Sequence, residues 1–283
     1  MPFTISHAAA VLPFVRRDGS GRGRLVPSLL VAGSFAPDVT YFAASAIPGA
    51  MEFGTFTHSF AGVCTVDVLF AAGLVALWRL VREPVLALLP GRARGRVWSL
   101  VRGRPAPGVP WLWWYVSAVL GAVTHVVWDA FTHHGRWGVR LVPVLGQDVA
   151  GSPLYWYAQY GTSALALVVT GLFLWRSVRA AAVAEGLPAP TAGQRWLALA
   201  LIGGCACGCG AVRVARWLAY VKGEGLDWAP WEVVPAVCFG AGAGLVVGVV
   251  AYAVAVRAWR GPAARTDPGV RERPAAPSRP GSR

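Results

Sequence analysis

The strongest constraint on this chain is a run of 24 residues, 233–256, that contains no charged side chain. Residues 154–175 form a second uncharged run, which is 22 residues long. An α-helix rises about 1.5 Å per residue, so roughly 20 apolar residues cross the ~30 Å hydrocarbon core of a bilayer. Lipid offers no partner for a backbone amide or carbonyl, and a helix pairs these groups within one segment. Both runs therefore predict membrane-spanning helices.

Four further apolar segments extend this pattern. Residues 196–212 are an uncharged run of 17, whereas 25–46, 60–80 and 111–132 each carry ionisable side chains. Only 14% of all residues are charged, compared with about a quarter in soluble domains, so the composition also fits a membrane protein. We expect an all-α fold, a polytopic membrane helical bundle with about six transmembrane helices.

The end of the chain differs from the rest in composition. Residues 261–283 are rich in Pro, Ala, Ser and Arg and offer no apolar face for packing, which is typical of disordered segments. The sequence therefore predicts two parts. An integral membrane helical domain covers residues 1–260, with its recognisable motifs in 1–180, and a disordered cytoplasmic tail covers 261–283.

Basic residues are concentrated in alternate connections between the expected spans. A formal net charge of +13 would favour nucleic-acid binding if Lys and Arg gathered on one folded polar surface, but here they occupy short loops. Connections 81–110 and 177–195 are Arg-rich, whereas 47–59, 133–153 and 217–232 are much less basic. The positive-inside rule places the Arg-rich connections and both termini in the cytoplasm. We expect a multi-pass protein of the plasma membrane that contacts the lipid bilayer and no nucleic acid.

Histidine and aspartate recur at four-residue intervals near the end of the third expected span. His125, Asp129 and His133 lie at about 0°, 40° and 80° around a helix, which makes one stripe, whereas His134 points away. Imidazole and carboxylate groups on one face suit a divalent cation such as zinc. A buried polar network, in which Asp129 only orients the two histidines, fits the same spacing. The spacing alone does not separate these two interpretations.

Other ionisable side chains fall in or beside the expected spans, where their burial is costly and indicates function. His58 is expected at the outer end of the second span, on the same side of the membrane as the stripe. Asp38 comes late in the first span, next to a proline that can bend the helix, and His7 lies in a short apolar segment before the first arginines. Asp67 follows His58 by nine residues, about 180° around a continuous helix, so the two are not expected to line one narrow pocket.

Several motifs occur in a fixed order in the first 180 residues: MPFTISHAAAVLP, AGSFAPD, FTHS, and GAVTHVVWDAFTH followed by GRWGV. In this order and spacing they resemble domain-of-unknown-function family 4184, a family of bacterial membrane proteins. That family is loosely similar to inner-membrane proteins described as membrane-bound metal-dependent hydrolases. The resemblance implies a shared set of motif positions: His7, Asp38, His58, His125, Asp129 and His133.

These observations lead to the hypothesis of a membrane-embedded metal-dependent hydrolase acting on a lipid or phosphoester at the outer leaflet. One or two divalent ions, with zinc expected, would be bound by four ligands: His58, His125, Asp129 and His133. A metal lowers the pKa of bound water enough to make it a nucleophile at neutral pH, and Asp38 or Asp129 would act as general base. His7 and Asp67 are further motif positions with no assigned step.

Two other classes of function use the same residues. In a non-enzymatic cation or proton transporter or channel, the ionisable groups would form the path of the ion. In a structural membrane protein, they would only hold the helices together. The sequence names no protein partner for any of the three.

Overall fold

Helices make up nearly all of the described chain. The computed structural model describes residues 3–102, 109–185 and 187–260. Within these ranges the β-structure is limited to one short antiparallel hairpin, β1 (Asp148–Val149) with β2 (Ser152–Pro153), and an isolated bridge. The expected all-α polytopic membrane fold is confirmed. The tail 261–283, for which we expect disorder, lies outside the described residues.

The number of candidate membrane spans is smaller than the sequence predicts. Among the described residues, four helices are long and apolar enough to cross a membrane. They are α8 (Trp111–Thr132), α10 (Leu154–Ala180), α11 (Ala192–Gly223) and α12 (Val234–Arg260), the last of which follows the 3-10 turn η5 (Pro230–Val233). The prediction of about six was therefore wrong, and both missing spans belong to the first 90 residues.

The first expected span, 25–46, is interrupted by a turn. Helix α2 (Pro27–Phe35) ends where the 3-10 turn η3 (Ala36–Asp38) begins, and a short α3 (Val39–Ala43) follows. Pro37 has no amide hydrogen to donate to the preceding turn, so one hydrogen bond of a continuous helix is missing there. The result is a bent segment with only nine residues in its longest helix, too short to cross a bilayer.

The second expected span, 60–80, is interrupted as well. After α4 (Gly54–Thr57), α5 (Phe60–Cys64) ends at Thr65, whose φ of −126° and ψ of −84° are not helical, and α6 (Val66–Ala87) starts anew. Helix α6 has 22 residues, but four charged side chains lower its hydropathy: Asp67, Arg79, Arg82 and Glu83. Helix α6 is long enough to span a membrane, but it carries too many charged residues to count among the candidate spans.

Helices α2 and α8 pack closely, and their contact positions the polar residues described below. A Cβ atom added at Gly33 of α2 would lie 2.3 Å from the carbonyl oxygen of Ala118, and one added at Gly121 of α8 would lie 2.3 Å from that of Leu30. Small residues let helix backbones approach in this way where lipid provides no hydrophobic drive for association. The short N-terminal elements η1 (Thr4–His7) and α1 (Ala8–Val11) pack against the same region, and η2 (Leu12–Phe14) follows them.

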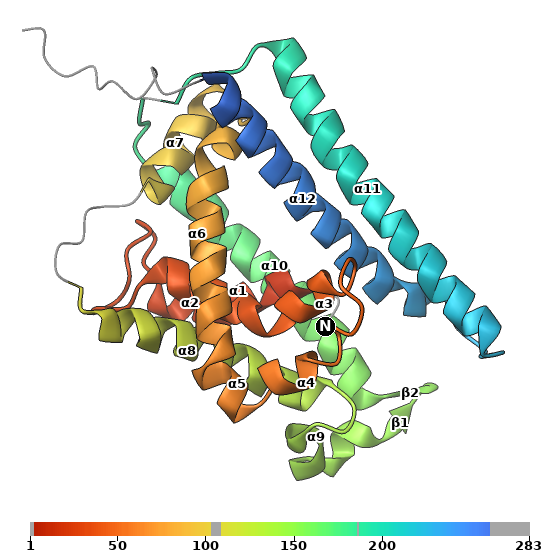
Figure 1. Ribbon diagram of the computed structural model, residues 1–283. Coiled ribbons are helices and arrows are strands. Elements are labelled where there is room, and N and C mark those ends of the chain that lie inside the picture. The colour runs from red at the N-terminus through yellow and green to blue at the C-terminus, as the bar shows by residue number, and fades with distance from the viewer. Residues whose placement is uncertain (1–2, 103–108, 186, 261–283) are drawn as a thin grey trace, which may run out of the picture.

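The last two spans form a separate pair. In Figure 1, α11 and α12 run side by side along one flank of the molecule, away from α2 and α8. Close contacts between small residues join them, and a Cβ atom at Gly244 would lie 2.1 Å from the carbonyl oxygen of Cys205. At the far end of α12, the Arg257 guanidinium donates to the Leu80 carbonyl of α6 at 2.8 and 3.1 Å.

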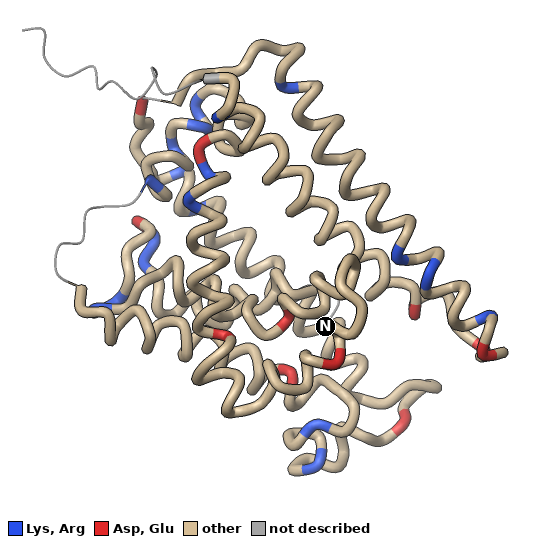
Figure 2. Tube along the Cα trace, viewed as in Figure 1, with Lys and Arg blue, Asp and Glu red and all other residues tan. Residues whose placement is uncertain are grey.

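Charged residues gather at the ends of the helices. Figure 2 shows Lys and Arg around α7 (Gly91–Val101) and the adjoining end of α6, while the middle of α10 carries none. At the opposite end of the molecule, α9 (Trp137–Leu141) and the turn η4 (Pro143–Gly146) connect α8 to the hairpin and α10 (Figure 1). Because 60–80 is not a candidate span, the expectation that His58 lies at the outer end of a span was wrong. The order of inside and outside loops after α8 does not change when two spans are removed, so the expected orientation of those loops stays a prediction.

Candidate metal centre

Two aspartates and two histidines from separate segments meet in the interior. Asp38 belongs to η3, His58 follows α4, and His125 and Asp129 lie one turn apart on α8. One ligand atom from each residue lies within 4.8 Å of the corresponding atoms of the other three. Their exposed fractions are 0% for Asp38 and His125, 2% for Asp129 and 7% for His58, so water does not solvate these groups. Ionisable groups this deep require a compensating charge or complete hydrogen bonding.

Local structure explains how these segments converge. The turn η3, which contains Pro37, contacts α8 and places Asp38 beside His125. The Thr57 hydroxyl donates to the Pro37 carbonyl at 2.8 Å and ties the end of α4 to this turn, which brings His58 beside Asp38. The four-residue spacing of His125 and Asp129 places both on one face of α8, as the sequence predicts.

A backbone carbonyl orients each imidazole of the centre. His125 Nδ1 lies 2.8 Å from the Ser34 carbonyl oxygen, and His58 Nδ1 lies 2.8 Å from that of Gly54. A carbonyl oxygen can only accept, so Nδ1 carries the hydrogen in both rings and Nε2 of a neutral ring keeps its lone pair. Metal-binding histidines in proteins commonly donate the N–H of their other ring nitrogen to such a carbonyl, which fixes the tautomer and the orientation of the ring.

The two Nε2 atoms face carboxylate oxygens across similar gaps. His125 Nε2 lies 3.4 Å from Asp38 Oδ1 and 3.5 Å from Asp129 Oδ2, and His58 Nε2 lies 3.6 Å from each of the same two atoms. Hydrogen bonds between such charged groups measure about 2.7–2.9 Å, so these gaps are too long. Three of the four atoms are buried without any hydrogen-bond partner: Asp38 Oδ1, His58 Nε2 and His125 Nε2.

A tetrahedral divalent ion accounts for both the gaps and the unpartnered atoms. Zinc binds nitrogen at about 2.0–2.1 Å and oxygen at about 2.0–2.2 Å, which places ligand atoms about 3.4 Å from one another around it. The measured separations of 3.4–3.6 Å match that spacing. Two imidazole nitrogens and two carboxylate oxygens are also a ligand set that suits zinc and related ions. The residues therefore fit a bound divalent metal.

Comparison with known families places the chain. A family model described as Domain of unknown function (DUF4184) matches residues 1–254. The chain belongs to this family. The match extends beyond the motif-bearing residues 1–180 through α11 and most of α12. Searches of curated proteins and of solved structures found no match, so the expected similarity to membrane-bound metal-dependent hydrolases stays a prediction.

In this DUF4184 protein, His133 does not complete the expected stripe. Helix α8 ends at Thr132, and His133 has an extended backbone with φ −132° and ψ 144°. Its Nδ1 lies 3.2 Å from the Asp129 carbonyl oxygen and its Nε2 lies 3.2 Å from Gln159 Nε2, so both ring nitrogens have neighbours outside the centre. Removal from water lowers the pKa of His133 to about 4, which keeps the ring neutral at pH 7. The prediction that His133 shares one helical face with His125 and Asp129 was wrong, because α8 ends one residue before His133.

His7 and Asp67 are both fully buried. The ring of His7 stacks on that of His125, with centroids 3.7 Å apart and an angle of 18° between the planes. Asp67 has no hydrogen-bond partner on either carboxylate oxygen. The expectation that Asp67 and His58 lie on opposite sides of one helix was wrong, because Thr65 breaks the helix between them. The structure does not place Asp67 among the four central residues.

The sequence did not identify several groups that contact the residues of the centre. The Thr4 hydroxyl donates to Asp38 Oδ2 at 2.5 Å and holds the oxygen that points away from the centre. The Ser34 and Gly54 carbonyls orient the rings, but a backbone carbonyl leaves no signal in the sequence. Thr4 does lie within the first motif, three residues before His7, and that proximity was its only signal.

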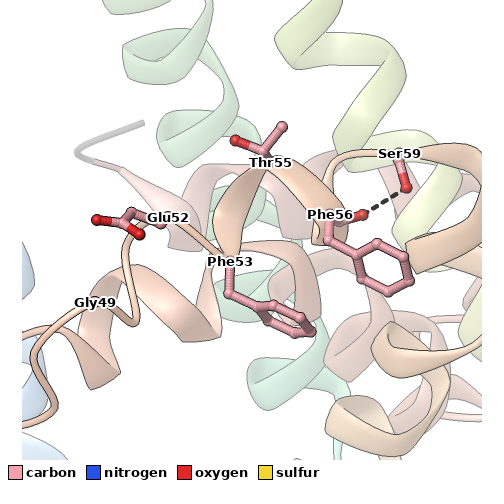
Figure 3. A pocket seen from close by; sticks show the side chains of 6 residues that line it. All are labelled: Gly49, Glu52, Phe53, Thr55, Phe56 and Ser59. Carbon is pink, nitrogen blue, oxygen red and sulfur yellow. Dashed lines mark hydrogen bonds between the residues drawn. The ribbon is translucent and has the colours of Figure 1, made fainter.

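A surface hollow of about 590 Å³ adjoins the segment that carries His58. It is lined by six residues: Gly49, Glu52, Phe53, Thr55, Phe56 and Ser59. Figure 3 shows the Phe53 and Phe56 rings side by side, with the Ser59 hydroxyl donating to the Phe56 carbonyl at 2.7 Å. The four residues of the centre are not among those that line it. The hollow therefore neighbours the centre in sequence without opening onto it.

Proposed function

We propose that this protein is a membrane-embedded metal-dependent hydrolase that acts on a lipid or phosphoester at the outer leaflet of the plasma membrane. The metal would be one divalent ion, with zinc expected, held by Asp38, His58, His125 and Asp129. One observation carries the proposal: buried lone-pair atoms converge at 3.4–3.6 Å and lack hydrogen-bond partners. A cation among them would satisfy all of these atoms at once.

A hydrogen-bonded network is the weaker account of the same residues. It would need a hydrogen between each Nε2 and a carboxylate oxygen, carried either by a cationic ring or by a protonated carboxyl group. Charge-assisted N–H···O bonds measure about 2.7–2.9 Å. The observed gaps of 3.4–3.6 Å exceed these lengths by half an ångström or more, so a metal explains the spacing better.

The chemistry divides between the ion and the protein. With four protein ligands, a bound divalent ion would have to take water or a substrate oxygen as a fifth ligand, which it would then polarise. The protein orients its ligands through the Ser34 and Gly54 carbonyls and excludes bulk water by burying them. A carboxylate, Asp38 or Asp129, would receive the proton of the attacking water.

Surface features next to the centre support a substrate from the bilayer. The segment leading to His58 exposes large apolar side chains, with Met51 at 55% and Phe53 at 45% exposure, and Phe60 just after it is 85% exposed. Such a surface is compatible with contact to acyl chains. Arg136 and Arg140 follow the centre in the connection after α8 and would attract an anionic head group.

Metal analysis of detergent-purified protein tests this function directly. We expect bound zinc in the wild type and in His134→Ala, whose side chain is exposed, and none in Asp129→Ala. Incubation with phospholipid vesicles should release a head group or fatty acid, and a chelator should abolish the release. A well-folded wild type that contains no metal and does not bind added zinc or manganese would contradict the proposal.

Burial of the centre gives some support to a second function, the cation path. No central residue is more than 7% exposed, which suits an ion that moves through the protein better than a bulky lipid. Uptake of radioactive zinc into proteoliposomes separates the two. Uptake that requires Asp129, together with no hydrolysis of any vesicle lipid, would favour the transporter.

A further inference from the structure

Asp129 presents its two carboxylate oxygens to two different sets of histidines. Oδ2 faces the Nε2 atoms of His125 and His58 at 3.5 and 3.6 Å, as described above. Oδ1 faces the opposite way, 3.4 Å from His7 Nε2 and 3.7 Å from His133 Nδ1. Oδ1 is buried and has no hydrogen-bond partner. The single ion of the proposed function leaves this oxygen unsatisfied.

His7 is unsatisfied in the same way. Its side chain is fully buried, and neither ring nitrogen has a hydrogen-bond partner. Because its ring stacks on that of His125, the two imidazoles direct Nε2 atoms at the two oxygens of one carboxylate. Ions bound to two imidazoles stacked 3.7 Å apart would lie close to one another, as the ions of two-metal sites do at roughly 3.5–4 Å.

We propose that a second divalent cation binds between His7 Nε2 and Asp129 Oδ1, so that Asp129 bridges two ions. The inference rests on the proposed function, because it places the second ion next to the first. Its remaining ligand positions would be open to water and substrate oxygen. An open position is the mark of a catalytic metal, whereas four protein ligands are typical of a structural one.

His133 is not a ligand of the second ion. Its Nδ1 lies 3.1 Å from the Thr132 hydroxyl and 3.2 Å from the Asp129 carbonyl oxygen, and Gln159 approaches its Nε2. Both nitrogens therefore have neighbours that a metal would have to displace. His133 instead lies beside the bridging carboxylate, with its Nδ1 3.7 Å from Asp129 Oδ1.

A bridged pair of ions narrows the substrate class and the choice of base. Two ions at this separation stabilise both the attacking and the leaving oxygen in phosphoryl transfer. Of the two proposed substrate classes, a phosphoester is therefore the one that this centre suits. With both Asp129 oxygens bound to metal, Asp129 cannot also act as the base.

Metal stoichiometry of purified protein tests the second ion. After saturation with zinc and removal of the excess, we expect two equivalents in the wild type and in His134→Ala, one in His7→Ala, and none in Asp129→Ala. One equivalent in both the wild type and His7→Ala would overturn the second site and leave the proposed function standing. No metal in the well-folded wild type would overturn both.

Electron paramagnetic resonance of the wild type provides a readout that does not depend on a variant folding. Manganese(II) ions about 3.5–4 Å apart couple magnetically, whereas a single ion gives an isolated six-line spectrum. Wild type loaded with two equivalents of manganese should give the coupled spectrum, and His7→Ala the isolated one. Two bound equivalents without coupling in the wild type would show that the second ion lies elsewhere.

Discussion

The metal centre and the α11–α12 pair are both held together by close backbone contacts, yet they bury opposite kinds of side chains. Around the centre, the fully buried residues include His7, Asp38 and His125. Between α11 and α12, the buried residues are small or apolar, such as Ala198 and Ala253. Packing of small residues is sufficient to join two helices in lipid, so the polar groups of the centre are not needed for assembly. Their cost in free energy is therefore best explained by function.

The two regions also differ in what covers them. Helix α11 leaves large apolar side chains without protein cover, including Trp196 at 71% and Leu197 at 73% exposure. Such a surface suits contact with lipid. The regions are not independent, because the Arg213 guanidinium of α11 donates to the Tyr41 carbonyl of α3 at 2.8 Å. The following predictions test whether packing of the α11–α12 pair can be weakened without loss of metal binding at the centre.

The largest effect is expected from Gly121→Val in the α2–α8 contact. The added side chain would meet the Leu30 carbonyl at 2.3 Å, and backbone can yield only if the helices separate. Separation would draw the Ser34 carbonyl away from His125 Nδ1. We expect a loss of about 3 kcal/mol in the free energy of unfolding, together with loss of bound metal. Thermal unfolding in detergent and metal analysis check this, with Gly73→Val as control because nothing lies within 4 Å of its added Cβ.

A smaller and more selective effect is expected from Gly244→Val in α12. Its Cβ would lie 2.1 Å from the Cys205 carbonyl oxygen, so the α11–α12 pair should loosen by about 1–3 kcal/mol. Metal content of the folded protein should stay at the wild-type level. Gly208→Val, which meets nothing within 4 Å, is the matched control on α11. Loss of metal in Gly244→Val alone would show that the two regions act as one unit.

Thr4→Val should weaken metal binding while leaving the fold nearly unchanged. The substitution keeps the shape of the side chain and removes the hydroxyl that donates to Asp38 Oδ2. Partners that orient metal ligands typically change affinity 10- to 100-fold, and we expect a dissociation constant raised by about that factor. Competition with a zinc-sensitive dye measures it. Thr4→Ser should restore the affinity, and equal weakening in both variants would argue against the hydrogen bond as the cause.

The smallest effect on stability is expected from single-cysteine substitutions that test the orientation of the protein in the membrane, which should leave stability unchanged. Single cysteines in a Cys-depleted background should react with an impermeant reagent in intact cells near Gly138 and Gly223, but not near Gly95. This result would place the metal centre and the loop between α11 and α12 on the same outer side. Labelling near Gly95 would reverse the orientation and place the centre towards the cytoplasm.

Much of the fold could be predicted from local features of the sequence. Long uncharged runs identify α10 and α12 because crossing lipid demands about 20 apolar residues in one helix. The failures at 25–46 and 60–80 came from giving apolar length more weight than the noted bend at Pro37 and the charges that follow Thr65. Pro37 and the charges of α6 were visible in the sequence, but nothing there indicated that Thr65 would leave the helical conformation.

The candidate site was predictable only in part. Periodicity showed that His125 and Asp129 share one face of a helix, because that relation depends on a single segment. It could not show that Asp38 and His58 reach the same point, since their approach depends on the bend at Pro37 and on the Thr57 hydrogen bond to it.

What the sequence alone determined was the chemical inventory: apolar helices for a membrane, and histidines and aspartates where burial is costly. Only the tertiary structure decided which of these side chains meet. It removed His133 from the stripe and stacked His7 on His125. The physical reason is that periodicity in the sequence shows only which residues share one face of a single helix. A set of metal ligands also requires that several helices and turns lie at the right distances from one another. Those distances are set by close contacts such as Gly33 against Ala118.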